Sequence, residues 1–163
     1  GLYQWQHARR HGRAVIDMLV TGSAPHQMPP QPRLVMADPE LAEIGMLPRD
    51  GQLRPGYHLY RESLFENDAA LAIGRAEGLL KLVVNDKGQL VGASIVGAGA
   101  ADLAAVLALA MENGVPIDAL ANLSVPDPSL MSVLVRVGQR HNSGHKPGGL
   151  TARLRSIRKF FPK

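Results

Sequence analysis

Hydrophobic and polar residues alternate in two neighbouring segments near the middle of the 163-residue chain. The runs "LLKLVVND" (residues 79–86) and "QLVGASIVG" (residues 89–97) flank a short turn at Asp86-Lys87-Gly88. Alternation with a period of two is typical of β-strands, and a short glycine-containing turn commonly joins two antiparallel strands. The pattern therefore predicts a β-hairpin over these residues.

Shorter extended segments are predicted before the hairpin. The run "RLVMADPELAEIGML" (residues 33–47) predicts two short strands separated by an Asp-Pro turn, and "YHLYRESLF" (residues 57–65) alternates like a third strand. The Gly- and Pro-containing run "TGSAPHQMPPQP" (residues 21–32) predicts a linker ahead of them.

Helical patterns occur at the start of the chain and after the hairpin. They cover residues 3–20, 101–112, 116–123 and 127–140. For the last of these helices, Asp127 is the expected N-cap and Pro128 lies in the expected first turn. Because the strands come first and most helices later, the sequence predicts an α+β fold with an antiparallel sheet packed against helices.

The formal net charge of +4 arises from the end of the chain. From Ser143 onward there are six cations and no acidic residue: Lys146, Arg153, Arg155, Arg158, Lys159 and Lys163. Taking these six from the 18 lysines and arginines leaves 12 basic residues against 14 acidic ones. A slightly acidic body argues against nucleic acid as a partner.

Several kinds of chemistry are excluded by composition. The chain has no cysteine, so it has no disulfide, no thiolate metal site and no cysteine nucleophile, which is compatible with the cytoplasm as its expected location. No apolar run approaches the ~18 residues of a membrane span. His7 and His11 have a spacing that suits a metal, but the neighbouring arginines favour a solvated cationic face, and no metal site is predicted.

The turn Gly97-Ala98-Gly99 joins the hairpin to the helix over residues 101–112 and partly resembles a dinucleotide-binding glycine loop. That loop needs a third glycine, whereas this chain has Asp102, whose carboxylate would repel a pyrophosphate. The strand before the turn is also the second arm of a hairpin. We interpret the turn as a strand-to-helix connection with an acidic residue that suits the helix dipole.

The order of these elements leads to a family resemblance. The runs "PRLVMADPELAEIGM" and "FENDAALAIGRAEGLLKLVVNDKGQLVGASIVGAGAADLAAVLALAMENGVPIDALANL" resemble the C-terminal dimerisation domain of pyridine nucleotide–disulfide oxidoreductases. Within that family they are most similar to mercuric-reductase-like and dihydrolipoamide-dehydrogenase-like flavoproteins. The positions that match are Asp38-Pro39-Glu40, Gly45, Glu77-Gly78, Lys81, Gly88, Gly92 and Gly97.

This resemblance implies three segments. Residues 1–30 would be the last helix of a preceding FAD-binding domain plus a linker, residues 31–140 the dimerisation domain, and residues 141–163 a basic amphipathic tail. FAD, NAD(P) and the redox cysteine pair would belong to upstream domains of a full-length parent, so no cofactor is expected in this chain. The expected partners are a second copy, as a homodimer, and those upstream domains.

Many members of the family also carry a His-Pro-Thr…Glu segment that supplies an acid–base histidine to the partner subunit. In this chain Asp127 stands at the histidine position and Ser132 at the glutamate position. An aspartate without an orienting carboxylate is a poor substitute for an imidazole near neutral pH. No catalytic residue is therefore predicted, and either the parent uses different chemistry or its reductase activity has been lost.

The helix over residues 101–112 is almost free of polar side chains and needs cover on more than one side. It is expected to form the dimer interface together with the last helix of the domain. The residues expected there are Leu103, Val106, Leu107, Leu130, Val133, Leu134 and Val137.

Two alternatives to a dimerisation domain remain at this point. One is a complete small enzyme that uses Asp127 or the histidines. The other is a stand-alone partner- or membrane-surface-binding module that acts through the basic tail, where Leu150, Leu154, Ile157 and Phe161 would form one stripe of a helix. Packing of that stripe onto protein is favoured over packing onto a membrane surface.

Overall fold

The computed structural model describes residues 5–23, 30–48 and 51–144 of the chain. The basic tail predicted from the sequence lies almost entirely outside the described residues, which end at Gly144. In chain order the elements are α1 (Trp5–Thr21), β1 (Arg33–Val35), β2 (Leu41–Gly45), β3 (Tyr57–Ser63), the short 3₁₀ helix η1 (Leu64–Glu66), α2 (Asp68–Ala72), β4 (Gly78–Asn85), β5 (Leu90–Gly97), α3 (Ala100–Glu112), α4 (Ile117–Leu120) and α5 (Ser132–Gly144).

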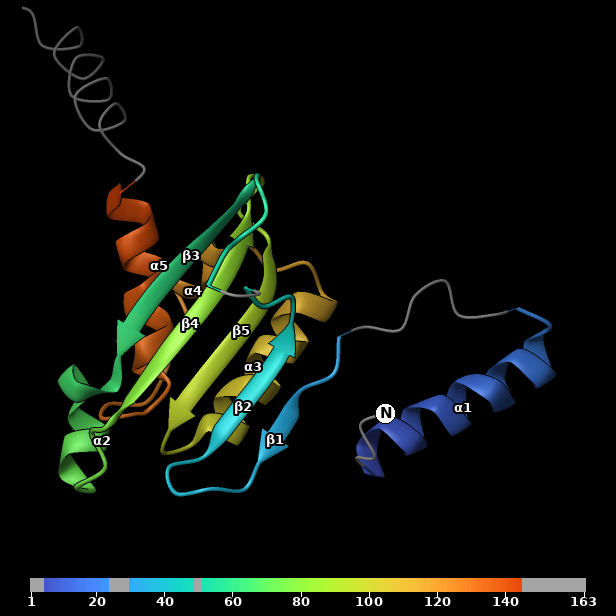
Figure 1. Ribbon diagram of the computed structural model, residues 1–163, viewed down its shortest axis with the longest axis horizontal. Coiled ribbons are helices and arrows are strands. Elements are labelled where there is room, and N and C mark those ends of the chain that lie inside the picture. Colours follow the sequence, from blue (N-terminus) through green and yellow to red (C-terminus); the bar gives the residue numbers. More distant parts are fainter. Residues whose placement is uncertain (1–4, 24–29, 49–50, 145–163) are drawn as a thin grey trace, which may run out of the picture.

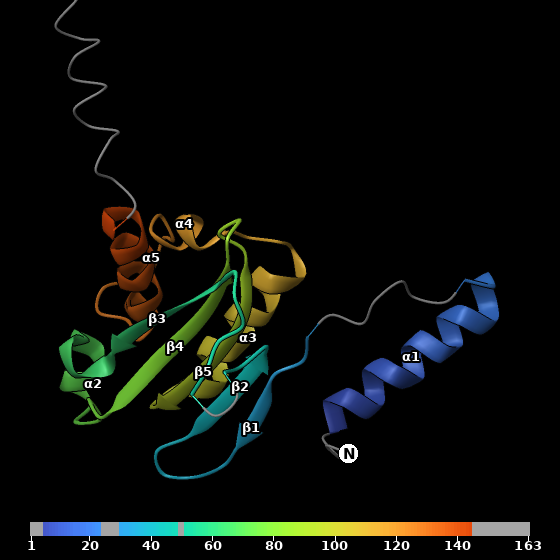
Figure 2. The same ribbon diagram turned by 45° about the horizontal axis from the view of Figure 1, so that its top comes forward.

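The strands form one five-stranded sheet in the order β1-β2-β5-β4-β3, with every pair antiparallel. The predicted β4–β5 hairpin lies inside this sheet, and the two short strands around the Asp-Pro turn add to its β5 edge. Helices α3 and α5 lie on one face, with α4 beside α5 (Figures 1 and 2). The predicted α+β fold is confirmed.

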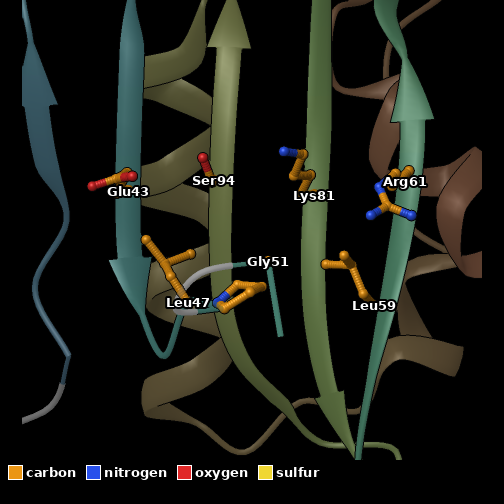
Figure 3. Close-up of a pocket in the computed structure, with 8 residues that line it drawn as sticks. Glu43, Leu47, Gly51, Leu59, Arg61, Lys81 and Ser94 are labelled. Atoms are coloured by element: carbon orange, nitrogen blue, oxygen red, sulfur yellow. The ribbon is translucent and has the colours of Figure 1, made fainter. Parts of the chain in front are cut away.

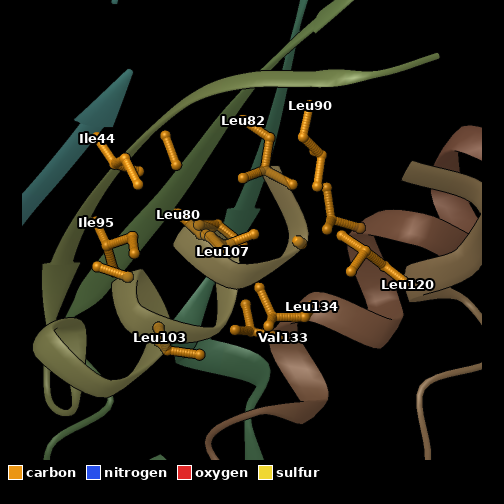
Figure 4. Close-up of a cluster of buried hydrophobic side chains, with 14 of the residues drawn as sticks. Ile44, Leu80, Leu82, Leu90, Ile95, Leu103, Leu107, Leu120, Val133 and Leu134 are labelled. Atoms are coloured by element: carbon orange, nitrogen blue, oxygen red, sulfur yellow. The ribbon is translucent and has the colours of Figure 1, made fainter. Parts of the chain in front are cut away.

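The hydrophobic core lies between the sheet and these helices (Figure 4). Leu80 and Leu82 of β4 and Ile95 of β5 meet Leu107 of α3 and Leu134 of α5, and all five are completely buried. Each such side chain contributes about 1.5–3 kcal/mol to folding through removal of apolar surface from water. Alternate residues of the strands therefore point into the core, and the residues between them face the opposite, uncovered side of the sheet.

Helix α5 begins later than the sequence predicts and also ends later. Asp127 precedes its first residue by five positions and is exposed, so the prediction that Asp127 caps this helix is wrong. Ser129 provides the acceptors instead. Its Oγ accepts a hydrogen bond from the Met131 N–H (3.1 Å), and its carbonyl accepts one from the Ser132 N–H (3.2 Å). At the other end, α5 continues to Gly144 and buries His141, which the sequence analysis had assigned to the tail.

Helix α1 confirms the helical pattern at the start of the chain but stands apart from the sheet in both views (Figures 1 and 2). An ion pair between Arg10 and Glu112 of α3 links it to the rest of the protein (2.9 Å). Its apolar residues Trp5, Ile16 and Leu19 remain largely exposed. Within the described residues, no helix is long and apolar enough to cross a membrane.

Candidate functional site

The outer side of α3 is an apolar surface that the fold leaves open on the helical side of the sheet. Leu109 is 63% exposed, Ala105 one turn before it is also exposed, and Val106 is partly exposed. Asp102 and Glu112 lie at the two ends of this stripe. A helix with hydrophobic residues on both sides and acidic residues only at its ends is typical of a helix that is covered on both sides.

A groove of about 630 Å³ adjoins this stripe. It lies between α3, α4 and the turn that follows α4, and most of its lining is apolar. The lining residues are Val106, Leu109, Ala110, Asn113, Val115, Ala119, Leu120, Asn122, Leu123 and Ser124. The stripe and the groove together are called the α3–α4 surface below.

The structure corrects most of the interface residues expected from the sequence. Five of the seven have no exposed area at all because they form the core under the sheet: Leu103, Leu107, Val133, Leu134 and Val137. A side chain without exposed area has none to offer a partner. Val106 and Leu130 keep part of their surface. Leu109, which the sequence does not predict there, is a large apolar side chain of α3 that is exposed.

The two residues at the family's acid–base positions are not brought together as a pair. Ser132 Oγ accepts a hydrogen bond from Asn67 Nδ2 (2.9 Å) and donates one to the Ser129 carbonyl (2.8 Å). The Asp127 carboxylate is exposed, and no hydrogen bond or ion pair to another described residue involves it. Within the described part of the chain, no side chain is placed to orient Asp127 for proton transfer.

Asn67 holds the segment that carries these residues, and the sequence analysis did not identify it. Its Nδ2 donates to the carbonyls of Ser129 (3.1 Å) and Leu130 (3.3 Å) as well as to Ser132 Oγ, while its Oδ1 accepts from the Ala70 N–H (3.0 Å). The side chain is almost completely buried. An asparagine directly before a short Ala-rich run is a recognisable N-cap signal, and α2 begins at the next residue.

Charged groups fasten α5 to the outer strand β3. The fully buried Glu62 carboxylate pairs with Arg136 (2.9 Å) and Arg140 (3.0 Å), and Arg136 also pairs with Glu66. Two guanidinium groups compensate the charge that burial would otherwise make very unfavourable. We interpret this network as structural, because both arginines come from one helix and serve to hold it.

A second polar contact joins α4, α5 and β3. His141 Nδ1 lies 2.5 Å from Asp118 Oδ1, and the Tyr60 ring meets the His141 ring edge-on at 5.1 Å. Burial raises the pKa of Tyr60, and the nearby Asp118 charge raises it further. Both effects favour the neutral phenol.

The glycine turn before α3 does not fit a nucleotide. The Glu40 side chain accepts a hydrogen bond from the Ala101 N–H at the start of α3 (3.3 Å), and the Glu40 carbonyl accepts one from the Gly97 N–H (3.0 Å). A carboxylate therefore occupies the place at the helix N-terminus where a phosphate would have to bind. Among the described residues, no group of three or more His, Cys, Asp or Glu side chains is arranged to hold a metal ion.

Comparison with known proteins identifies the family to which this fold belongs. The family model for the pyridine nucleotide-disulphide oxidoreductase dimerisation domain matches residues 31–137. The chain belongs to this family. Its members are FAD-binding oxidoreductases linked to pyridine nucleotides.

The dihydrolipoyl dehydrogenase of Geobacillus stearothermophilus is 31% identical to this dimerisation domain over 110 residues, which is 66% of this chain and 23% of that protein. The dihydrolipoyl dehydrogenase of Chlorobaculum parvum is also 31% identical, over 122 residues that cover 72% of this chain and 26% of that protein. The chain thus spans about a quarter of the length of these curated relatives.

Two solved structures share the fold. The Cu(II) complex of the HOCl-induced flavoprotein disulfide reductase RclA from Escherichia coli superposes with a TM-score of 0.75 at 21% identity, covering 85% of this chain and 32% of that one. LpdA from Mycobacterium tuberculosis gives a TM-score of 0.71 at 21% identity, covering 80% of this chain and 29% of that one.

Proposed function

We propose that the chain joins two copies of itself through the α3–α4 surface, as the dimerisation part of a FAD-dependent, NAD(P)-linked disulfide oxidoreductase. The exposed Leu109 beside an apolar groove is the observation that carries this proposal. The flavin, nucleotide and redox-cysteine parts would lie in other domains of the parent, since the chain matches only about a quarter of its relatives.

Two-fold symmetry makes this surface suitable for self-association. In such an interface the same patch serves both copies, so every apolar contact is made twice. Full burial of a leucine contributes about 1.5–3 kcal/mol, and each of two copies would gain the part of this that corresponds to the 63% of Leu109 still exposed. Asp102, Glu112 and Asn113 surround the apolar stripe and would form a polar rim of the kind that interfaces have.

Helix α1 supports the existence of a larger parent. Trp5, Ile16, Leu19 and Val20 are each more than half exposed. Apolar side chains concentrated on one helix need cover, and an upstream domain of the same protein would provide it.

The chain itself would supply no catalytic group of the family type. Asp127 is exposed and has no orienting partner among the described residues, and Ser132 is already engaged with Asn67 and Ser129. The glycine turn is filled by Glu40, and the chain has no cysteine. Incubation of the purified chain with FAD followed by gel filtration should therefore give a colourless protein, and flavin that co-elutes with it would contradict this part of the proposal.

Sedimentation equilibrium tests the association itself. The wild-type chain should fit a dimer, and Leu109→Asp should fit a monomer because two carboxylates would be buried at the interface. Leu71→Asp is the matched control, since Leu71 is 50% exposed on α2, away from α3. A dimer that persists in Leu109→Asp, or a wild-type chain that stays monomeric at high concentration, would contradict the proposal.

A further inference from the structure

The uncovered face of the sheet carries a row of polar side chains across four strands. Strand register places Arg61 of β3 opposite Lys81 of β4, Lys81 opposite Ser94 of β5, and Ser94 opposite Glu43 of β2. The residues on either side of each of these four face the helices, so all four face away from them. Figure 3 shows the Lys81 amine directed toward Ser94, with Arg61 on the neighbouring strand.

The two cations at the end of this row, Arg61 and Lys81, have no acidic partner at ion-pair distance among the residues that the structure describes. The nearest acidic residue in the row, Glu43, is paired with Arg33 of β1 instead (2.8 Å). Like charges directly opposite each other on neighbouring strands are destabilising, and an anion bound between them would remove that cost.

The segment after β2 covers part of this face of the sheet. It folds back over β5, where the Met46 N–H donates to the Val91 carbonyl (2.8 Å). Gly92 allows this close approach, because a Cβ there would lie 1.7 Å from the Met46 carbonyl oxygen. Val83 faces the same side and is fully buried, so this otherwise uncovered face is covered locally beside the polar row.

A pocket of about 280 Å³ lies between this segment and the polar row. Leu47 and Pro48 form one wall, and Leu59 of β3 lies beside the cations. The pocket thus combines a cationic end, a hydroxyl group and apolar walls, and Glu43, which is paired with Arg33, lines the end opposite the cations. Its volume lies just below the 300–1,000 Å³ that is usual for pockets that hold larger ligands, so it suits a small molecule.

We propose that this pocket binds a small organic carboxylate. Arg61 offers two parallel N–H donors to a carboxylate, Lys81 adds a second positive charge, and the Ser94 hydroxyl supplies a further donor. A short hydrocarbon body would contact Leu47 and Leu59. The site faces away from the α3–α4 surface, so it does not depend on dimerisation.

An NMR titration of the ¹⁵N-labelled chain with sodium butyrate at constant ionic strength tests the proposal. The amide signals of Lys81, Ser94 and Leu47 should shift together and saturate, while butanol should give no saturable shift there. Inorganic phosphate should bind more weakly, because it lacks the hydrocarbon body. Equal affinity for phosphate, or equal shifts with butanol, would overturn the assignment to a carboxylate.

Variants locate the binding site. Lys81→Met should weaken butyrate binding at least ten-fold, and Arg61→Lys should weaken it while keeping the charge. Lys87→Met is the control, because Lys87 is exposed in the hairpin turn outside the pocket. Circular dichroism checks that each variant is folded. Wild-type affinity in both Lys81→Met and Arg61→Lys would overturn the proposal.

Discussion

The two sides of α3 have almost the same composition and different surroundings. On the inner side, Leu103 and Leu107 are completely buried against the sheet. On the outer side, Ala105 and Leu109 face away from the sheet, and Leu109 is 63% exposed. Hydrophobicity alone therefore does not say whether a residue stabilises the fold or is available for association. That difference is set by which side the other elements cover.

Truncation of a leucine on each side should give the largest contrast in stability. Leu107→Ala should lower the free energy of unfolding by about 2–5 kcal/mol, because it leaves a cavity in a packed core. Leu109→Ala should change it by no more than about 0.5 kcal/mol when measured on monomeric protein. Urea unfolding at low protein concentration measures both, and equal losses would break the distinction between the two sides.

Removal of the Asn67 side chain should loosen the segment that leads into α5. Asn67→Ala deprives the carbonyls of Ser129 and Leu130 of a donor and removes the cap of α2. The expected loss is about 1–3 kcal/mol, the cost of buried polar groups left without partners. Hydrogen exchange should rise first in α2 and at the start of α5, and unchanged exchange there would contradict the assigned role.

The N-terminus of α5 offers a smaller effect with an internal control. Ser129→Ala should lower the free energy of unfolding by about 1 kcal/mol, because its Oγ accepts a hydrogen bond from the Met131 N–H immediately before α5. Asp127→Ala should cost almost nothing, since its exposed carboxylate has no described partner. Thermal unfolding of the two variants side by side decides between them, and a larger loss for Asp127→Ala would restore it as the cap.

The sequence predicts those parts of the fold that depend on local signals. The β4–β5 hairpin follows from alternation around Asp86-Lys87-Gly88, and the end of α3 follows from Asn113-Gly114. The sequence could not predict which side of α3 faces the sheet. Apolar residues occur all around the helix in "AADLAAVLALAME", so their spacing does not distinguish a buried side from an exposed one. Only the packing of the other elements determines which side of α3 is buried.

The other features that the sequence does not predict also depend on contacts between residues far apart in the chain. Burial of Glu62 depends on Arg136 and Arg140, more than seventy positions later in the chain. The juxtaposition of Arg61 and Lys81 depends on the register of β3 and β4. Pro128 suits a first turn and so predicts Asp127 as the cap, but the acceptors are those of Ser129, which lies closer to the first helical residue.

A single introduced cysteine tests most directly whether two copies meet at the outer side of α3. The natural chain has no cysteine, so Ala105→Cys would provide its only thiol. A short bis-maleimide should cross-link this variant into a covalent dimer with high yield. Ala72→Cys at the end of α2 should remain a monomer on a denaturing gel. Cross-linking of Ala72→Cys but not of Ala105→Cys would contradict the assignment of the interface to α3.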